Sequence, residues 1–356
     1  FVPSSPAGLT EGVWMFFSGI IGQERAKRFL KSVILRERIP HAYLFTGIPG
    51  VGKTSTAKAL TVALNCRNPI EFDGCGQCPV CRQIQGGNFP DFICVKPDGQ
   101  NIKIEQVREL NHTLSFPPVT GSYRVSVINQ AATMTAEAAN AFLKTLEEPP
   151  RHNILVLTTT EPFDLLPTLV SRCQRVAFQP LPVEEMTQWL IREKEVDSAS
   201  AGILSKAAEG SLGVALKILG SDFLDQRRQW LHDLETLFSA SKAAALQTAV
   251  RSTEGKNRWG LRVSDTGETG LTDMLDTWET WYRDLLVVRT GGSRALILNA
   301  DIQDRLEAAV SRFETDGLIR SIFVLDQALN DLKRMRNPSL VMENTVLTLK
   351  RFASAA

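Results

Sequence analysis

The sequence predicts an α/β module built on a parallel sheet, followed by a small helical domain and a larger all-α domain. Three observations predict this order. Up to residue 180, short apolar runs alternate with helical patterns, which is typical of a parallel sheet covered by helices on both faces. A glycine-rich pattern of the phosphate-binding type follows the first of these runs. After Pro180 the strand signal stops and only helical spacing remains.

The predicted strands are short and rich in Val, Ile, Leu or Phe. They occupy residues 42–47, 91–97, 124–129, 153–159 and 174–180. Helical patterns lie between them, including residues 53–65, 104–116 and 135–148. Strands that alternate with helices in this way are expected to pair in parallel through helical crossovers.

The same patterns divide the chain into four predicted parts. Residues 1–14 begin without Met and have no periodicity, so we expect a tail or an upstream extension, with Met15 as a candidate natural start. Residues 15–180 form the α/β module, residues 181–220 a helical lid, and residues 221–356 a helical domain. Within the last part, the polar, Gly-rich residues 251–270 are expected to form a loop.

Composition narrows the class of function. Of 356 residues, 43% are hydrophobic and 22% are charged, which are ordinary values for a globular protein. The 40 basic and 39 acidic residues nearly cancel, whereas a protein that binds nucleic acid by itself usually has a basic excess. Protein partners are therefore expected first. No apolar run approaches the length of a membrane span and no secretory pattern is visible, so we expect a cytoplasmic protein that does not enter a membrane.

The stretch "GIPGVGKTS" at residues 47–55 fits the phosphate-loop pattern G-x-x-x-x-G-K-[ST]. It follows an apolar strand and opens a helix, which is the context that this motif needs. Lys53 would reach the phosphates, and the Thr54 hydroxyl would bind magnesium. The alternative is a Gly-rich turn without a ligand. The predicted nucleotide-binding residues here are Gly47, Gly50, Gly52, Lys53, Thr54 and Ser55.

The third predicted strand ends in two amides, Asn129 and Gln130. In phosphate-binding ATPases this strand end usually carries two acids, one for magnesium and one for the attacking water. An amide has no charge and fewer acceptor sites than a carboxylate, so it holds magnesium poorly. Gln130 cannot take a proton from water, although a glutamine can position one, which leaves weak turnover open.

Four cysteines cluster between residues 66 and 81 with the spacing C-x8-C-x2-C-x2-C. The candidate ligands are Cys66, Cys75, Cys78 and Cys81. Four thiolates in a short segment suit a structural zinc ion. Disulfides are disfavoured in the expected compartment, and a redox pair would not need four cysteines. An iron–sulfur cluster stays open as the stronger rival. Cys173 stands apart, and Cys94 is expected to be a buried strand residue.

Two further stretches complete a resemblance to a known family. They are "INQAATMTAEAANAFLKTLEEPP" at residues 128–150 and "TTTEPFDLLPTLVSRCQRVAF" at residues 158–178. Together with the phosphate loop and the cysteine module, they resemble bacterial clamp-loader ATPase subunits of DNA polymerase III, which are AAA+ proteins, and within these the delta-prime group. The resemblance is strong over residues 17–219. It is weaker beyond, where residues 281–291 and 336–344 resemble the family's collar domain.

The resemblance implies roles for particular residues. Residues 47–55 would be the Walker A loop, and Asn129 and Gln130 would be a degenerate Walker B pair. Thr159 and Thr160 fall on sensor 1, near the γ phosphate. Gly213 falls on sensor 2, where hydrolysing members carry an arginine. Ser171 and Arg172 match the "SRC" motif, whose arginine acts in trans on a neighbouring subunit; a surface salt bridge is the alternative for Arg172.

The resemblance implies a largely non-hydrolysing stator that lends Arg172 to a neighbouring ATPase subunit. Its cofactors would be a structural zinc ion and weakly held ATP or ADP with magnesium. Its partners would be gamma or tau and delta subunits in a hetero-pentamer, and through that complex the sliding clamp and primer-template DNA. One alternative is an ATP-hydrolysing motor subunit of the gamma or tau type. Another is a metal-stabilised nucleotide sensor that works alone.

Overall fold

The computed structural model describes residues 16–239, 241, 243–247, 270–334 and 336–353. The expected tail, Met15 and residues 251–269 of the expected loop lie outside these ranges. The chain forms two compact units. The first holds the residues up to Pro182 together with Glu209–Val214, and the second holds Val183–Ala208 and the residues from Ala215 onward. The division of the helical part at residue 220 stays a prediction. Among the described helices, none is both long and apolar enough to cross a bilayer.

The first unit contains the predicted five-stranded parallel sheet. Its strands are β1 (Ala42–Thr46), β2 (Phe92–Val95), β3 (Arg124–Ile128), β4 (Asn153–Thr159) and β5 (Gln174–Ala177). They lie in the order β2-β3-β4-β1-β5. In the register of the sheet Thr46 lies opposite Thr159, and Ile128 lies opposite Leu157. The carboxyl ends of β1, β3 and β4 therefore meet at one edge, where ligands bind in open α/β sheets.

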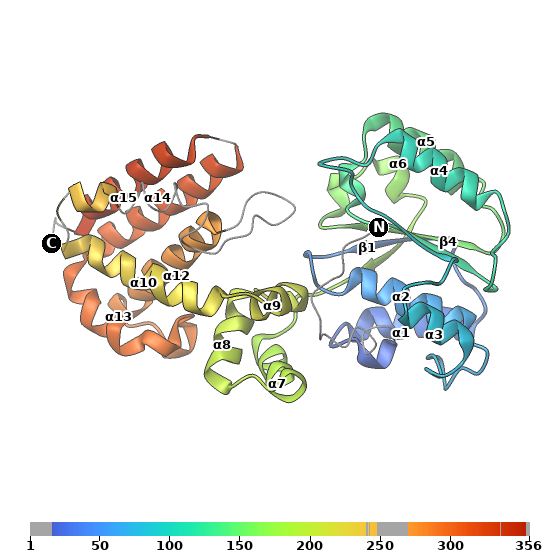
Figure 1. Cartoon of the computed structure of the whole chain (residues 1–356), viewed down its shortest axis with the longest axis horizontal. Coiled ribbons are helices and arrows are strands. Elements are labelled where there is room, and N and C mark those ends of the chain that lie inside the picture. Colours follow the sequence, from blue (N-terminus) through green and yellow to red (C-terminus); the bar gives the residue numbers. More distant parts are fainter. Residues whose placement is uncertain (1–15, 240, 242, 248–269, 335, 354–356) are drawn as a thin grey trace. The chain divides into compact units, whose positions relative to one another are not determined.

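Strand residues alternate between the two faces of this sheet. Leu44 and Leu155 pack on one face against α4 (Ile104–Leu114), α5 (Ala136–Glu147) and α6 (Pro167–Val170). Tyr43, Phe45 and Val156 pack on the other face against α1 (Glu24–Leu35) and α2 (Lys53–Asn65). Figure 1 shows α4, α5 and α6 on one side of the sheet and α1, α2 and α3 (Pro79–Gln85) on the other. Burial on both faces explains why the strands are continuously apolar.

Short elements link these layers. They are the 3-10 turns η2 (Phe17–Gly19), η3 (Ala131–Thr133) and η4 (Pro162–Asp164). Helix α5 begins where the Thr135 hydroxyl accepts the N–H of Ala138 and ends just before Pro149. Cys94 lies in β2, but it is only partly buried because β2 is an edge strand of the sheet. The prediction of a buried Cys94 was wrong in this respect.

The second unit is helical, as predicted. Its helices are α7 (Val183–Lys194), α8 (Ser198–Ala207), α9 (Leu212–Leu219, whose first residues belong to the first unit), α10 (Phe223–Ser239), α12 (Leu271–Arg289), α13 (Gln303–Ala309), α14 (Thr315–Lys333) and α15 (Pro338–Ala353). The 3-10 turns η5 (Arg294–Leu296), η6 (Ala300–Ile302) and η7 (Val310–Arg312) were not predicted.

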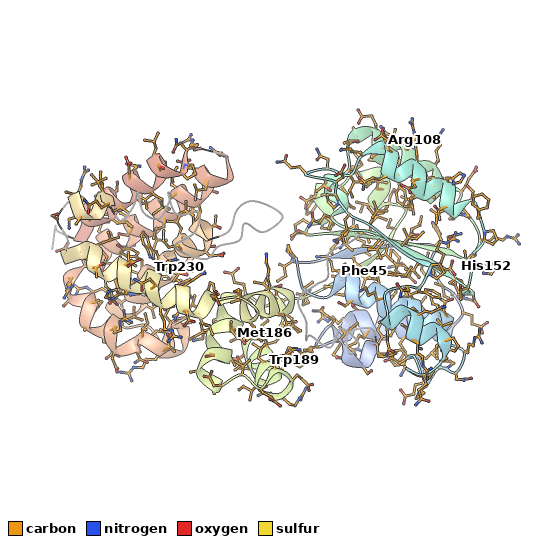
Figure 2. All side chains as sticks on the ribbon, viewed as in Figure 1. Phe45, Arg108, His152, Met186, Trp189 and Trp230 are labelled. Carbon is orange, nitrogen blue, oxygen red and sulfur yellow. The ribbon has the colours of Figure 1, made fainter. Side chains whose placement is uncertain are left out.

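Aromatic side chains dominate the core of the second unit. Trp230, Trp278 and Trp281 are almost wholly buried, and the Trp278 Nε1–H donates to the Trp230 carbonyl oxygen at 2.9 Å. The ring of Phe238 stacks on Trp281 with centroids 5.8 Å apart. Figure 2 marks Trp230 in this core and Phe45 in the separate core of the first unit. Each unit thus has its own hydrophobic core.

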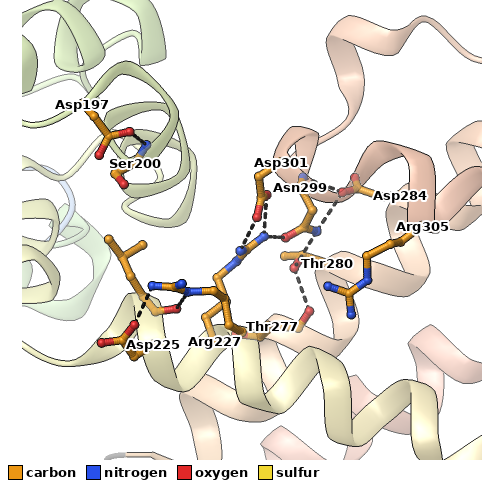
Figure 3. A network of polar contacts seen from close by, with 12 residues as sticks. Asp197, Ser200, Asp225, Arg227, Thr277, Thr280, Asp284, Asn299, Asp301 and Arg305 are labelled. Atoms are coloured by element: carbon orange, nitrogen blue, oxygen red, sulfur yellow. Dashed lines mark hydrogen bonds and ion pairs between the residues drawn. The ribbon is translucent and has the colours of Figure 1, made fainter.

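A buried polar network ties α10 to the segment after α12. The Arg227 guanidinium makes two hydrogen bonds of 2.8 Å to the Asp301 carboxylate and one of 2.6 Å to Asn299 Oδ1 (Figure 3). The backbone and side-chain N–H groups of Asn299 donate in turn to Asp284 Oδ2, each at 2.7 Å. Because Asp284 is fully buried, these donors compensate for the loss of water around its charge.

Candidate nucleotide site and metal centre

The phosphate loop joins β1 to α2 in a conformation that requires glycine. Gly47, Gly50 and Gly52 have φ of 141°, 73° and 106°, a region that L-residues with side chains rarely adopt. The Gly47 N–H donates to the carbonyl oxygens of Thr159 and Thr160 at 3.2 and 3.1 Å, which ties the loop to the end of β4. The loop is therefore held beside β4.

Lys53 opens α2 and folds over the loop. Its ammonium donates to the carbonyl oxygens of Gly47 and Ile48, the latter at 2.8 Å. Burial disfavours the charged form and lowers the pKa of Lys53 to about 8. With a phosphate bound, the Lys53 ammonium would donate to the phosphate in place of these neutral carbonyl oxygens. An anion is a stronger hydrogen-bond partner for an ammonium than a neutral acceptor is.

A cavity of about 470 Å³ lies over this loop. The predicted residues that line it come from the loop and the ends of β3 and β4 and include Gly50, Gly52, Lys53, Thr54, Ser55, Asn129, Gln130, Thr159, Thr160 and Gly213. Gly47, which was also predicted to bind nucleotide, is not among the lining residues. Thr158 and Asp164 line the cavity too, and they were not predicted from the sequence. Thr158 begins the run of three threonines, and Asp164 ends the short turn η4 after β4.

Thr158 engages both amide residues at the end of β3. Its hydroxyl donates to Asn129 Oδ1 at 2.9 Å and accepts the backbone N–H of Gln130 at 3.1 Å. Gln130 itself has a left-handed backbone, with φ 54° and ψ 52°. The side-chain oxygen of Asn129 is thus occupied by a hydroxyl. These residues fit a magnesium ion poorly, because the strand end offers no carboxylate and the Asn129 amide oxygen already accepts one hydrogen bond.

The end of β4 places a carboxylate next to a buried threonine. The Thr159 hydroxyl lies 3.1 Å from the Glu161 carbonyl oxygen and 3.5 Å from Asp164 Oδ2. The same Asp164 oxygen accepts the backbone N–H of Glu161 at 3.1 Å. Thr159 is therefore held by its own turn, and Asp164 brings a negative charge to the cavity.

The segment around Gly213 lies directly on the phosphate loop. The Gly213 N–H donates to the Gly50 carbonyl oxygen at 2.9 Å, and the Ser211 hydroxyl donates to the Pro49 carbonyl oxygen at 2.7 Å. A Cβ atom on Gly213 would come within 2.9 Å of Gly50 Cα. This close contact between the two backbones leaves no room for a side chain at position 213, which excludes an arginine there.

Arg172 lies outside this cavity, just after α6. Its Nη2 atom is 2.6 Å from Glu147 Oε1, and its Nη1 atom donates to the Thr168 carbonyl oxygen at 2.9 Å. The Ser171 hydroxyl donates to the same carbonyl oxygen at 3.1 Å, and it too lies outside the cavity. The fold therefore does not bring Arg172 to the phosphate loop of its own chain.

The four predicted cysteines converge between α2 and α3. All four sulfur atoms lie within 4.8 Å of one another, and Cys66 Sγ is 3.9 Å from Cys78 Sγ and 3.7 Å from Cys81 Sγ. A tetrahedral zinc site with Zn–S bonds of about 2.3 Å places its sulfur atoms about 3.8 Å apart. Although burial works against ionisation, N–H donors such as that of Cys81 lower the pKa of the Cys78 thiol to about 6. The cluster fits one zinc ion.

Comparisons with known proteins agree on one family. The family model described as "DNA polymerase III, delta subunit" matches residues 22–182. The Bacillus subtilis DNA polymerase III subunit delta' is 29% identical over 330 residues, which cover 92% of this chain and 96% of that protein. The Bacillus subtilis subunit tau is 28% identical over 94% of this chain, and the Escherichia coli subunit tau is 37% identical over 57% of it. The chain spans 61% and 32% of the lengths of these two tau subunits.

Solved structures match most of the chain but with low similarity. A gamma subunit-related protein of DNA polymerase III from Thermotoga maritima has a TM-score of 0.42 at 19% identity and covers 92% of this chain and 99% of that one. The RuvB Holliday junction branch migration motor of the same organism has a TM-score of 0.44 at 18% identity and covers 79% and 86%. Both scores lie below 0.5.

The sheet order, the loop after β1 and the helices on both faces define an α/β fold of the P-loop nucleotide-binding class. A helical second unit and a cysteine cluster after α2 accompany it. The sequence matches point to one family: this chain is related to the clamp-loader subunits of bacterial DNA polymerase III.

Proposed function

We propose that this chain is a largely non-hydrolysing clamp-loader subunit of the delta-prime type, which lends Arg172 to the nucleotide site of a neighbouring subunit. The observation that carries this proposal is the end of β3. There Asn129 and Gln130 replace the usual acids, and the Asn129 oxygen is occupied by the Thr158 hydroxyl. The chain keeps a phosphate loop but lacks the groups that would hold magnesium and activate water.

The position of Arg172 supports the second half of the proposal. It lies outside the cavity of its own chain on a surface segment, and its partner Glu147 is also exposed to solvent. An arginine supplied in trans raises phosphoryl transfer by roughly a thousandfold or more. A contribution of this size is a physical reason for a subunit to keep its fold after it has lost the groups that hydrolyse its own ATP.

The partners that follow are gamma or tau subunits next to Arg172, a delta subunit, and a hetero-pentamer that loads a sliding clamp on primer-template DNA in the cytoplasm. Collar packing through the second unit would hold the subunits together. A structural zinc ion on Cys66, Cys75, Cys78 and Cys81 would fix the segment between α2 and α3.

The test is the clamp- and DNA-stimulated ATPase rate of a loader assembled from this chain, motor subunits and delta. Arg172→Ala is expected to lower the rate by roughly a thousandfold at the dependent site. Arg175→Ala is the matched control, because Arg175 is an exposed arginine three residues away on β5. If the two variants have equal rates, Arg172 is no trans finger.

The second candidate function is an ATP-hydrolysing motor of the gamma or tau type. The intact Lys53 and Thr54 and the similarity to tau subunits favour it. Measurable magnesium-dependent turnover by this chain alone would support the motor and contradict the stator. The stator would be supported if ATP hydrolysis appears only in the assembled loader and if Lys53→Ala in this chain leaves that hydrolysis in place.

A further inference from the structure

The cavity over the phosphate loop presents phosphate-binding groups on its loop side. Lys53, the loop glycines Gly50 and Gly52, and the first turn of α2 all line it. Such groups bind phosphate without any metal, because a helix N-terminus and a row of backbone N–H groups carry partial positive charge. This side can neutralise part of the charge of a phosphate chain.

In an ATPase the end of β3 carries acids that bind magnesium, whereas in this chain the same side of the cavity carries uncharged amides. Asn129 Oδ1 accepts the Thr158 hydroxyl, so the amide keeps one acceptor site on this oxygen and two N–H donors on its nitrogen. No hydrogen bond from these donors to another described residue exists, and Asn129 lines the cavity. An N–H donor attracts phosphate oxygens and repels a cation. The position that carries an acid in an ATPase therefore offers N–H donors to an anion and no negative charge to a cation.

Only one carboxylate lines the cavity among the described residues, and it belongs to Asp164. It is anchored by the Glu161 N–H and lies beside the Thr159 hydroxyl. A triphosphate carries more charge than a diphosphate, and without magnesium it would meet this carboxylate unshielded. Gly213 offers no cation to offset it, because its backbone lies against Gly50 and leaves no room for a side chain.

We propose that this cavity binds a nucleoside diphosphate without magnesium and discriminates against the triphosphate through Asp164. The site would then respond neither to ATP binding nor to ATP hydrolysis. It would hold the first unit in one nucleotide-bound state while neighbouring subunits pass through their ATPase cycles. The proposal rests on the nucleotide-binding part of the proposed function and is independent of the role of Arg172.

The test measures the dissociation constants of ADP and ATP for the full chain by calorimetry, in excess magnesium and in EDTA. ADP is expected to bind equally well in both, and ATP roughly tenfold more weakly than ADP in both. Asn129→Asp is expected to make binding tighter with magnesium than with EDTA, because it restores a metal-binding carboxylate. Asp164→Asn is expected to strengthen ATP binding and so to reduce the difference between the dissociation constants of ATP and ADP.

Glu161→Gln is the matched control for Asp164→Asn. It removes the same charge three residues away, on a side chain that does not line the cavity, and should leave that difference unchanged. Tighter binding of ATP than ADP by the wild-type chain, or a requirement for magnesium, overturns the inference. Absence of binding by either nucleotide also overturns it, but leaves the trans role of Arg172 intact, since that role is measured on the neighbour's ATPase.

Discussion

The Arg172 guanidinium lies 2.6 Å from the Glu147 carboxylate, at the point where α5 ends before its two prolines. Both side chains are partly exposed, so water and salt screen their attraction. An exposed ion pair of this kind contributes only about 0–1 kcal/mol. Arg172 can therefore leave Glu147 for a partner's phosphate at small cost, and the surface ion pair is compatible with a role in trans.

Glu147→Gln is accordingly expected to have a small effect on an assembled loader. Freeing Arg172 should raise the stimulated ATPase rate by at most about fivefold, the equivalent of about 1 kcal/mol. Glu148→Gln is the control, since the neighbouring Glu148 makes no ion pair with another described residue. A loss as large as that of Arg172→Ala would contradict the idea that Glu147 only holds the arginine in place.

Nucleotide affinity is expected to depend on pH through Lys53. Burial lowers the pKa of Lys53 to about 8, and only the charged ammonium attracts phosphate. Affinity for ADP should therefore be nearly constant below pH 8 and fall as the pH rises above it. Lys53→Arg is the control, because an arginine stays charged throughout this range. Titration calorimetry between neutral and alkaline pH measures both proteins, and equal profiles would contradict the prediction.

The cysteine cluster predicts one zinc ion per chain. Cys78 and Cys81 belong to a small apolar cluster with Val62, Val80 and Ile84, so metal loss should loosen the segment between α2 and α3. Cys81→Ser or chelation is expected to remove the metal and lower the melting temperature of the first unit. Cys173→Ser, which lies outside the cluster, should do neither. Metal analysis decides the identity, and a brown protein that contains iron would contradict zinc.

The buried network of the second unit predicts unequal effects of two adjacent substitutions. Arg227→Met leaves the Asp301 and Asn299 oxygens without their partner and should destabilise this unit by about 3 kcal/mol. Arg228→Met removes an exposed pair with Asp225 at 2.5 Å, worth at most about 1 kcal/mol, and a long exposed hydrogen bond to the Leu224 carbonyl oxygen. Urea unfolding followed by tryptophan fluorescence reports this unit, because Trp230 lies on the same helix. Similar midpoints for both variants would contradict the prediction.

Features encoded within a short stretch of chain could be predicted from the sequence. The phosphate loop, the strands and the cysteine spacing all depend on neighbouring residues, and the structure confirms the sheet and the clustering of the four thiols. Thr158 and Asp164 were missed because three threonines follow one another in β4 and an acid in a turn is ordinary. That all of them line the cavity depends on how β4 pairs with β1 and β3, which no single segment encodes.

The sequence by itself determined that the chain keeps a phosphate loop while Asn129 and Gln130 stand where two acids are expected. Only the tertiary structure decided what those amides do. Parallel pairing brings Thr158 to Asn129 across 29 positions of sequence, and folding brings Gly213 onto Gly50. Hydrogen bonds and close backbone contacts act over a few ångströms. Their outcome is therefore set by which distant segments the sheet and its covering helices bring together.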